Sequence, residues 1–182
     1  MAKHRELRAK LEWFTEYYPK GLRIKVMASP QGGYQGMIEY IPGEFAHRPV
    51  IARGFMFIHC IFVGFRKECK GRGLASSLIE ACINDAKSQE MNGVAVVTRK
   101  GSFMAGTPQC PYTEKNVVAI LETAQNTYKI KTQLIDLKDH LAAQSTPNPF
   151  GSFAMLYNGK ILSHHPISNT RFENIMNSII DQ

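Results

Sequence analysis

The sequence predicts an α/β fold in which a mixed β-sheet is flanked by helices. Three strand-like segments, 22–28, 34–41 and 53–63, precede a glycine-rich turn, an amphipathic segment and the apolar stretch "GVAVVTR". Strand, turn, helix and strand in this order predict a crossover unit within one sheet. The chain has 182 residues, of which 44% are hydrophobic, so it can bury the core of one domain or of two small ones.

The first element is a helix over "HRELRAKLEWFTEYY", which Pro19 ends. Leu7, Leu11, Phe14 and Tyr18 form one apolar stripe along it, as is typical of an amphipathic helix. The strands "LRIKVMA", "YQGMIEYI" and "RGFMFIHCIFV" follow, with turns at "SPQGG" and "PGEFAHRP". The next helix is predicted over "LASSLIEACINDAK", where apolar residues recur at helical spacing.

A stretch rich in glycine and proline, "KGSFMAGTPQCP", marks an internal boundary. We therefore expect a first domain over residues 1–108 and a second over 109–182. The second should contain a helix at about 113–128, a strand "TQLIDL" and a loop "AAQSTPNP". A hairpin that turns on Asn158 and Gly159 and a closing helix "NTRFENIMNSII" complete it.

Charge and cysteine content restrict the partners and the compartment. The net charge of +7 comes from scattered residues rather than a basic run, so we expect a polyanionic small ligand or a solvated basic surface, and no nucleic acid. No apolar run approaches the roughly 18 residues that span a bilayer, so we expect no membrane partner and a cytoplasmic location. The four cysteines, Cys60, Cys69, Cys82 and Cys110, form no C-x-x-C pair and are interpreted as reduced thiols without zinc.

The stretch "KGRGLASS", residues 70–77, places two glycines and two cations directly before a helix. Free N–H groups at a helix start attract anions, glycines allow a close approach, and Lys70 and Arg72 add positive charge. The loop therefore suits a phosphate or pyrophosphate, and the alternative is a glycine turn with solvated cations. It is not a Walker loop, because no G-K-[ST] follows.

The segment "HCIFVGFRKECKGRGLASSLIEACINDAKSQEMNGVAVVT" resembles the central motif of the GNAT superfamily of N-acetyltransferases, with Lys70 where the family usually has Arg or Gln. "IEYIPGEFAHRPV" and "VAVVTRKGSFMAG" resemble those GNAT proteins that carry a YoaP-like C-terminal domain. "QCPYTEKNVVAILETA" and "FAMLYNGKILSHHPISNTRFENIM" resemble that C-terminal domain. Because "NPF" followed by the hairpin "FAMLYNGKIL" fits a thioredoxin-like order, we expect a small thioredoxin-like second part. The resemblance covers most of residues 20–180.

This resemblance implies acetyl transfer from acetyl-CoA to the amine of a small molecule or peptide. The residues that it implies for cofactor binding are the strand residues Ile61 and Val63, which face the pantetheine arm and thioester, and the loop residues Lys70, Gly71, Arg72, Gly73, Leu74, Ala75 and Ser76, which hold the pyrophosphate. A homodimer is compatible with this function.

Three residues are candidates for the proton transfers. His59 lies four residues before Val63, where some GNAT members have a base histidine, and its alternative is a buried core histidine. Glu44 is the second candidate base, or a solvated carboxylate. Tyr112 lies near the position of the family's acid tyrosine, or is a packing residue.

The sequence differs from the GNAT pattern in two ways, and a different function competes with acetyl transfer. The loop between Val63 and Lys70 is longer than the common GNAT spacing, and the acetyltransferase core is abridged at its start and after "VAVVTRKGSFMAG". The rival is a thiol protein, because "CPYT" before a helix resembles a glutaredoxin site without its second cysteine, and a helix start lowers the pKa of such a thiol as Cys110. A non-catalytic CoA-binding or interaction module is a further alternative.

Overall fold

The computed structural model describes residues 3–64, 66–97, 111–146, 148 and 153–180, and the side chains of residues 3–6 and 111–114 are outside this description. The elements of the first part are α1 (Lys3–Tyr17), β1 (Arg23–Ala28), β2 (Tyr34–Pro42), η1 (Gly43–Phe45), β3 (Phe55–Val63), η2 (Lys67–Cys69), α2 (Leu74–Ser88) and β4 (Gly93–Ala95). Those of the second part are α3 (Pro111–Asn126), α4 (His140–Gln144), β5 (Met155–Tyr157), β6 (Lys160–Ser163) and α5 (Asn169–Ile180). The predicted boundary at residue 108 lies outside the described residues.

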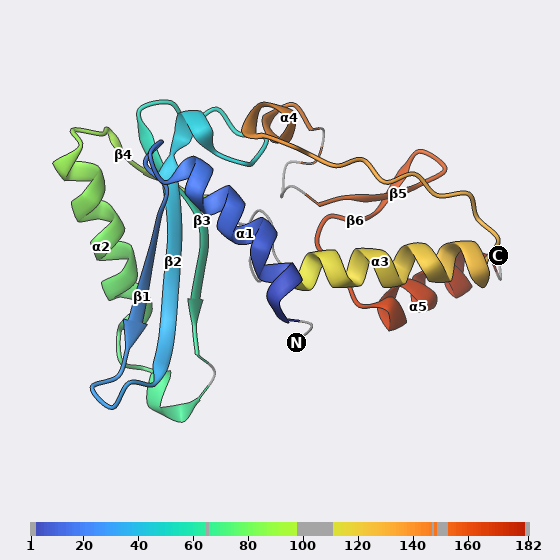
Figure 1. Cartoon of the computed structure of the whole chain (residues 1–182), viewed down its shortest axis with the longest axis horizontal. Helices are drawn as coiled ribbons and strands as arrows, with labels where there is room; N and C mark the ends of the chain where they lie inside the picture. Colours follow the sequence, from blue (N-terminus) through green and yellow to red (C-terminus); the bar gives the residue numbers. More distant parts are fainter. Residues whose placement is uncertain (1–2, 65, 98–110, 147, 149–152, 181–182) are drawn as a thin grey trace.

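A four-stranded sheet of order β1-β2-β3-β4 forms the first part (Figure 1). The pairs β1–β2 and β2–β3 are antiparallel, whereas β4 pairs with β3 in parallel through Phe55–Phe57. The crossover through α2 produces this parallel pair, so the prediction of a mixed α/β sheet is confirmed.

Helix α2 covers one face of the sheet. The apolar side chains that form this core come from α2 and from the two central strands: Ile38, Tyr40, Met56, Ile58, Leu78, Cys82 and Ala86. A polar contact also fixes the helix, because the Tyr40 hydroxyl donates to Asp85 and the Lys25 Nζ lies 3.1 Å from the same carboxylate. The burial of Leu78, Cys82 and Ala86 agrees with the helical spacing read from the sequence.

Helix α1 covers the opposite face, but not with the apolar stripe that predicted it. Leu7, Leu11 and Tyr18 are 47%, 63% and 50% exposed. The buried side chains are instead Trp13 and Tyr17, which pack against Leu22 and Ile41. Larger aromatic side chains bury more apolar area than leucine, so they decide which side of the helix faces the sheet.

The second part has its own hydrophobic cluster between α3, α5 and the β5–β6 hairpin: Ile120, Ala124, Ile167, Phe172 and Met176. The hairpin turns where predicted, with left-handed φ values of +47° at Asn158 and +75° at Gly159. The helices predicted at about 113–128 and at 169–180 are likewise present as α3 and α5.

Two predictions for the second part were wrong. The segment 132–137, predicted as a strand, has no regular secondary structure, and its Leu134 and Ile135 are 63% and 72% exposed. The sheet described in this part consists of β5 and β6, which pair with each other, so no ladder includes the segment. Part of the predicted loop 142–149 instead belongs to α4, which Asp139 caps by accepting from the Ala142 N–H at 2.7 Å.

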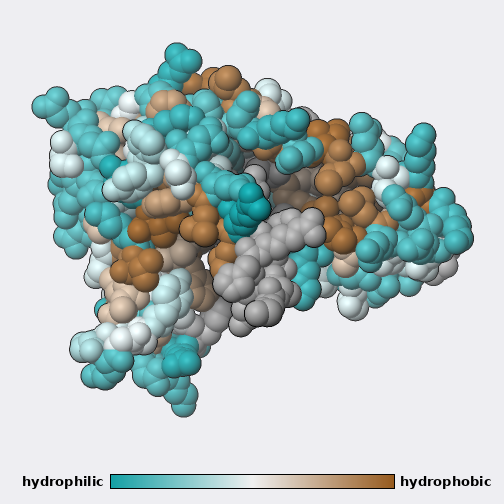
Figure 2. Space-filling view, in the orientation of Figure 1, coloured by the Kyte–Doolittle hydropathy of each residue, from teal (hydrophilic) through white to brown (hydrophobic). Residues whose placement is uncertain are grey.

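A thioredoxin-like second part stays a prediction, since a single hairpin is the sheet seen within residues 111–146 and 153–180. Hydrophobic patches interrupt the hydrophilic surface of both parts on the face seen in Figure 2. Among the helices in the described ranges, none is long and apolar enough to cross a membrane.

Candidate functional site

Strand β3 contains a β-bulge at His59. Cys60 lies opposite Glu39 on β2, and Ile58 lies opposite the next residue, Tyr40, so His59 is the extra residue in β3. A bulge bends a strand and re-aims its side chains, and bulges are frequent beside functional sites. His59 lies on the α1 face of the sheet, among buried polar groups, and the bulge shifts the alternation after it, so that Ile61 packs on the same α2 face as Ile58.

The glycine loop follows β3 and leads into α2. Gly71 and Gly73 have φ values of +68° and +70°, a left-handed conformation that favours glycine. Gly73 is the N-cap of α2, no side chain caps the helix, and its first turn holds no acid. A Cβ built on either glycine would meet no protein atom within 4 Å, so the surface above the loop is open. The first amides of α2 therefore face outward with their positive potential.

The predicted cofactor residues lie along this loop and the end of β3. Most loop residues, namely Lys70, Gly71, Arg72, Gly73, Ala75 and Ser76, are exposed, and Leu74 is half-buried. Ile61 and Val63 are half-buried and pair with Ile38 and Gly36 of β2. The predicted residues thus lie at the end of β3 and at the start of α2, with η2 between them along the chain.

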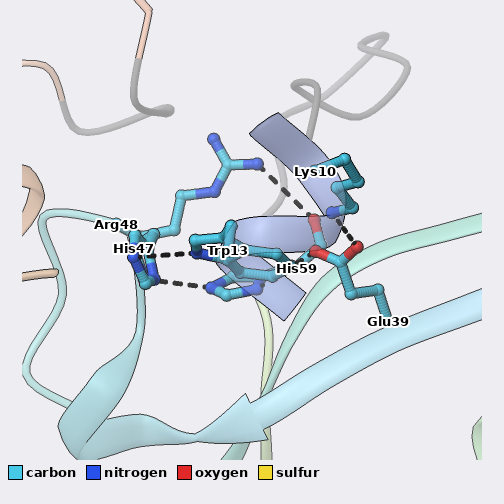
Figure 3. Close-up of polar contacts among 6 residues, drawn as sticks. All are labelled: Lys10, Trp13, Glu39, His47, Arg48 and His59. Carbon is cyan, nitrogen blue, oxygen red and sulfur yellow. Dashed lines mark hydrogen bonds and ion pairs between the residues drawn. The ribbon is translucent and has the colours of Figure 1, made fainter. Parts of the chain in front are cut away.

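A second group of polar side chains is buried between α1 and the sheet (Figure 3). Glu39 is fully buried, and His47, Arg48 and His59 are 3–4% exposed. The Lys10 Nζ lies 2.5 Å from Glu39 Oε2, and the His59 Nδ1 lies 3.3 Å from Glu39 Oε1. We call these residues, together with Trp13, the buried polar cluster.

The hydrogen bonds of the cluster fix the tautomer of His59. The backbone N–H of His47 donates to His59 Nε2 at 3.0 Å. Because this nitrogen accepts, a neutral His59 carries its proton on Nδ1, which faces Glu39. The indole N–H of Trp13 donates in turn to His47 Nε2 at 3.1 Å. The guanidinium of Arg48 lies 3.5 Å from the carbonyl oxygen of His59.

Burial sets the charge states within the cluster. Desolvation lowers the pKa of His47 to about 3, with His59 and His140 adding to the effect. Desolvation also lowers the pKa of His59, although Glu39 acts in the opposite direction. Burial alone would raise the pKa of Glu39, but its 3.3 Å contact with His59 and the charge of Lys10 hold that pKa below the ordinary value. At neutral pH the cluster therefore holds two neutral histidines and one Lys10–Glu39 ion pair.

The other predicted catalytic residues lie elsewhere. Glu44 in η1 is exposed, and its Oε1 accepts from the Gly54 N–H at 2.9 Å. Tyr112 is in the first turn of α3, with its side chain outside the description, and Cys110 lies outside the described residues. The structure thus joins His59 to the buried polar cluster and not to Glu44. The catalytic roles of His59, Glu44 and Tyr112 stay predictions.

Sequence reasoning missed the residues that surround His59: Lys10, Trp13, Glu39, His47 and Arg48. One signal was available, because Glu39 interrupts the otherwise apolar end of "GMIEYI" at an inward-facing position of the strand. A charge at such a position needs a partner, and Lys10 on the preceding helix supplies it.

Comparison with known proteins connects both parts of the chain to one relative. Residues 131–174 match the family model described as YoaP-like. The chain is 22% identical to the "Uncharacterized N-acetyltransferase YoaP" of Bacillus subtilis (strain 168), over 97% of this chain and 87% of that protein. The alignment extends over 232 positions, more than the 182 residues here, so the relative contains residues without a counterpart in this chain.

Solved acetyltransferase structures are more distant. The structure of AAC(6')-Iy in complex with the bisubstrate analog CoA-S-monomethyl-acetylneamine is 17% identical, covers 72% of this chain and 79% of its own, and has a TM-score of 0.43. A GNAT-family acetyltransferase from Staphylococcus aureus Mu50 is 12% identical, covers 75% and 74%, and has a TM-score of 0.40. Likenesses at this level assign no role to any residue.

The evidence for kinship therefore comes from the sequence of the whole chain and from its C-terminal segment. The chain is similar to the N-acetyltransferase YoaP over nearly its whole length, and its residues 131–174 match the YoaP-like model, so the predicted resemblance to N-acetyltransferases with a YoaP-like domain is confirmed.

Proposed function

We propose that the protein is an N-acetyltransferase that moves an acetyl group from acetyl-CoA to an amino group of a small molecule or peptide. The observation that carries this proposal is the glycine loop between β3 and α2. Its left-handed glycines, uncapped helix start and exposed Lys70 and Arg72 suit the pyrophosphate of CoA. The relationship to a protein named as an N-acetyltransferase over 97% of this chain supports the same reaction.

Acetyl-CoA supplies the acyl group in this reaction. A bond forms between the amine nitrogen and the carbonyl carbon, the carbon–sulfur bond breaks, and the CoA thiolate leaves. The amine must lose a proton, and the thiolate takes one up. The donor that we propose for polarising the thioester carbonyl is an N–H of β3 near Ile61 or Val63, with the pantetheine arm along this strand.

His59 and Glu44 are the two candidates for taking the amine proton. The neutral His59 uses Nε2 to accept from His47, so it can serve as a base only if the backbone at His47 moves away. Glu44 is exposed and lies three residues before His47, and an amine can approach it without such a movement. Tyr112 is the candidate that returns a proton to the thiolate.

The experiment that tests the function is a calorimetric titration with acetyl-CoA of the wild-type protein and of Gly73→Asp. The substitution places a negative charge at the helix start and forces a left-handed φ on a residue with a side chain. Because a side chain at this position meets no protein atom, we expect the fold to be kept while acetyl-CoA affinity falls at least tenfold. Equal affinity of the two proteins would remove the loop from the site.

A further inference from the structure

The YoaP-like segment is hydrogen-bonded to the loop that holds His59. We call residues 43–48, which run from η1 to Arg48, the 43–48 loop, and Figure 1 shows α4 beside it. The Gln144 side-chain amide nitrogen donates to the carbonyl oxygens of Glu44 and Ala46, both at 3.0 Å. One amide group thus uses both of its N–H bonds on backbone groups about 100 residues away in the sequence.

Aromatic contacts support this docking of α4. The ring of His140 packs against Phe45 and His47 with centroid distances of 5.4 and 6.1 Å. Its Nδ1 also lies 3.2 Å from the Tyr17 hydroxyl, on α1. Helix α4 therefore contacts the 43–48 loop through two side chains one helical turn apart, His140 and Gln144.

The 43–48 loop has little freedom at its other end. A Cβ at Gly43 would lie 1.9 Å from the carbonyl oxygen of Ala52, so the two backbone segments are in close contact there. Beyond Gly43 the Gln144 hydrogen bonds and the bond from the His47 N–H to His59 hold the backbone of the loop. Two side-chain bonds add to them, from the Gly54 N–H to Glu44 and from the Trp13 indole to His47. Both candidate bases depend on this loop, because it carries Glu44 and its backbone holds His59.

The geometry points to Gln144 as a positioning residue for the proposed acetyl-transfer site. Gln144 holds the 43–48 loop in the conformation in which the His47 amide binds His59 and the Glu44 side chain is exposed. The YoaP-like segment then completes a site whose acyl-donor loop belongs wholly to the first part. This inference rests on the proposed function, but the position of the loop is measurable without any acetyl transfer.

The test compares Gln144→Met, which keeps the side-chain volume and removes both donors, with a matched control, Gln125→Met. Gln125 donates to Thr132 at 2.6 Å within the second part, so the control loses a similar hydrogen bond far from the loop. For Gln144→Met we expect the His47 amide to exchange with deuterium at least tenfold faster than in the control. Because Glu44 is the candidate base that acts without a movement of the loop, a loosened loop displaces it. We therefore expect kcat for acetyl transfer to fall at least tenfold, with KM for acetyl-CoA within twofold of the wild-type value.

A second variant, Gln144→Glu, presents an acceptor to two carbonyl oxygens and should increase both effects. Melting temperatures of all variants show whether a loss of kcat reflects global unfolding, which lowers the fraction of active protein and leaves the KM for acetyl-CoA unchanged. Equal exchange and equal kcat in Gln144→Met and Gln125→Met would overturn the inference, and so would a rise in kcat. If the wild-type protein itself neither binds acetyl-CoA nor transfers acetyl, the proposed function fails, and the exchange rate of the His47 amide alone decides whether Gln144 holds the loop.

Discussion

At the scale of single residues, the two ring nitrogens of His59 distinguish a base from a structural histidine. Nε2 accepts from the His47 amide and Nδ1 faces Glu39, so both are used inside the protein. Glutamine can accept and donate in the same directions, whereas leucine can do neither. The pair His59→Gln and His59→Leu therefore separates hydrogen bonding from proton transfer.

We expect His59→Gln to keep its stability within about 1.5 kcal/mol and to keep the pH dependence of kcat/KM, because glutamine can keep the hydrogen bond from the His47 amide and the polar contact with Glu39. His59→Leu should lose about 2–4 kcal/mol, since the Glu39 carboxylate and the His47 amide are then left without this partner in the interior. Urea unfolding and a pH–rate profile give both quantities. A loss of about 10² in rate in His59→Gln, with its ionisation gone, would instead identify His59 as the base.

At the scale of elements, α1 offers a direct test of which face stabilises the sheet. Trp13 is 6% exposed and donates to His47, whereas Leu11 is 63% exposed. We expect Trp13→Ala to lower the free energy of unfolding by about 3–5 kcal/mol and Leu11→Ala to change it by less than about 1 kcal/mol. Unfolding followed by circular dichroism measures both, and comparable losses would show that the exposed stripe is covered in solution.

Helices α1 and α2 together show what the sequence could and could not predict. The helical period of α2 and the glycines before it are local signals, and both the helix and the loop were predicted. The orientation of α1 was not, because apolar spacing allowed two faces and the choice depends on a sheet formed later in the chain. The bulge at His59 and the Lys10–Glu39 ion pair depend on strand register and on helix docking, which no local pattern encodes.

In the segment 132–137 a local signal was present, but the predicted strand did not form. Its apolar and β-branched residues are typical of a short strand, but a strand needs a neighbour with which to pair. In the described part of the chain, β5 and β6 pair with each other, and the segment remains irregular with Leu134 and Ile135 exposed. Local preference decides an element only where the rest of the fold supplies its partner.

At the scale of the whole molecule, three elements meet around one buried histidine. Lys10 and Tyr17 from α1, His59 from β3 and His140 from α4 all lie near the His47 ring. Docking of α1 and α4 therefore keeps water away from His47 and makes its protonation costly in the folded state. Because α4 belongs to the YoaP-like segment, that segment affects how the stability of the first part changes at acidic pH.

The sign of that dependence follows from the pKa of His47, which burial lowers from 6.5 to about 3. Above pH 6.5 His47 is neutral whether the chain is folded or unfolded, so it adds no pH dependence there. Below pH 6.5 the unfolded chain binds a proton that the folded chain excludes, and stability falls by about 2 kcal/mol at pH 5 from this residue alone. The lowered pKa of Glu39 affects stability at lower pH. The stability that Glu39 contributes is present above its ordinary pKa of 4.5 and is lost as the pH falls below that value.

Urea unfolding at pH 7 and pH 5, followed by the fluorescence of Trp13, the sole tryptophan, therefore isolates the histidines. We expect the wild-type protein to lose at least about 2 kcal/mol between these two pH values and His47→Gln to lose about 2 kcal/mol less than the wild type. Glutamine can still accept from the Trp13 indole but cannot be protonated, so the comparison removes the titration and retains the hydrogen bond. Equal stability of the wild-type protein at the two pH values would mean that water reaches His47 in the folded state, and the docking of α1 and α4 around it would then be looser than their contacts indicate.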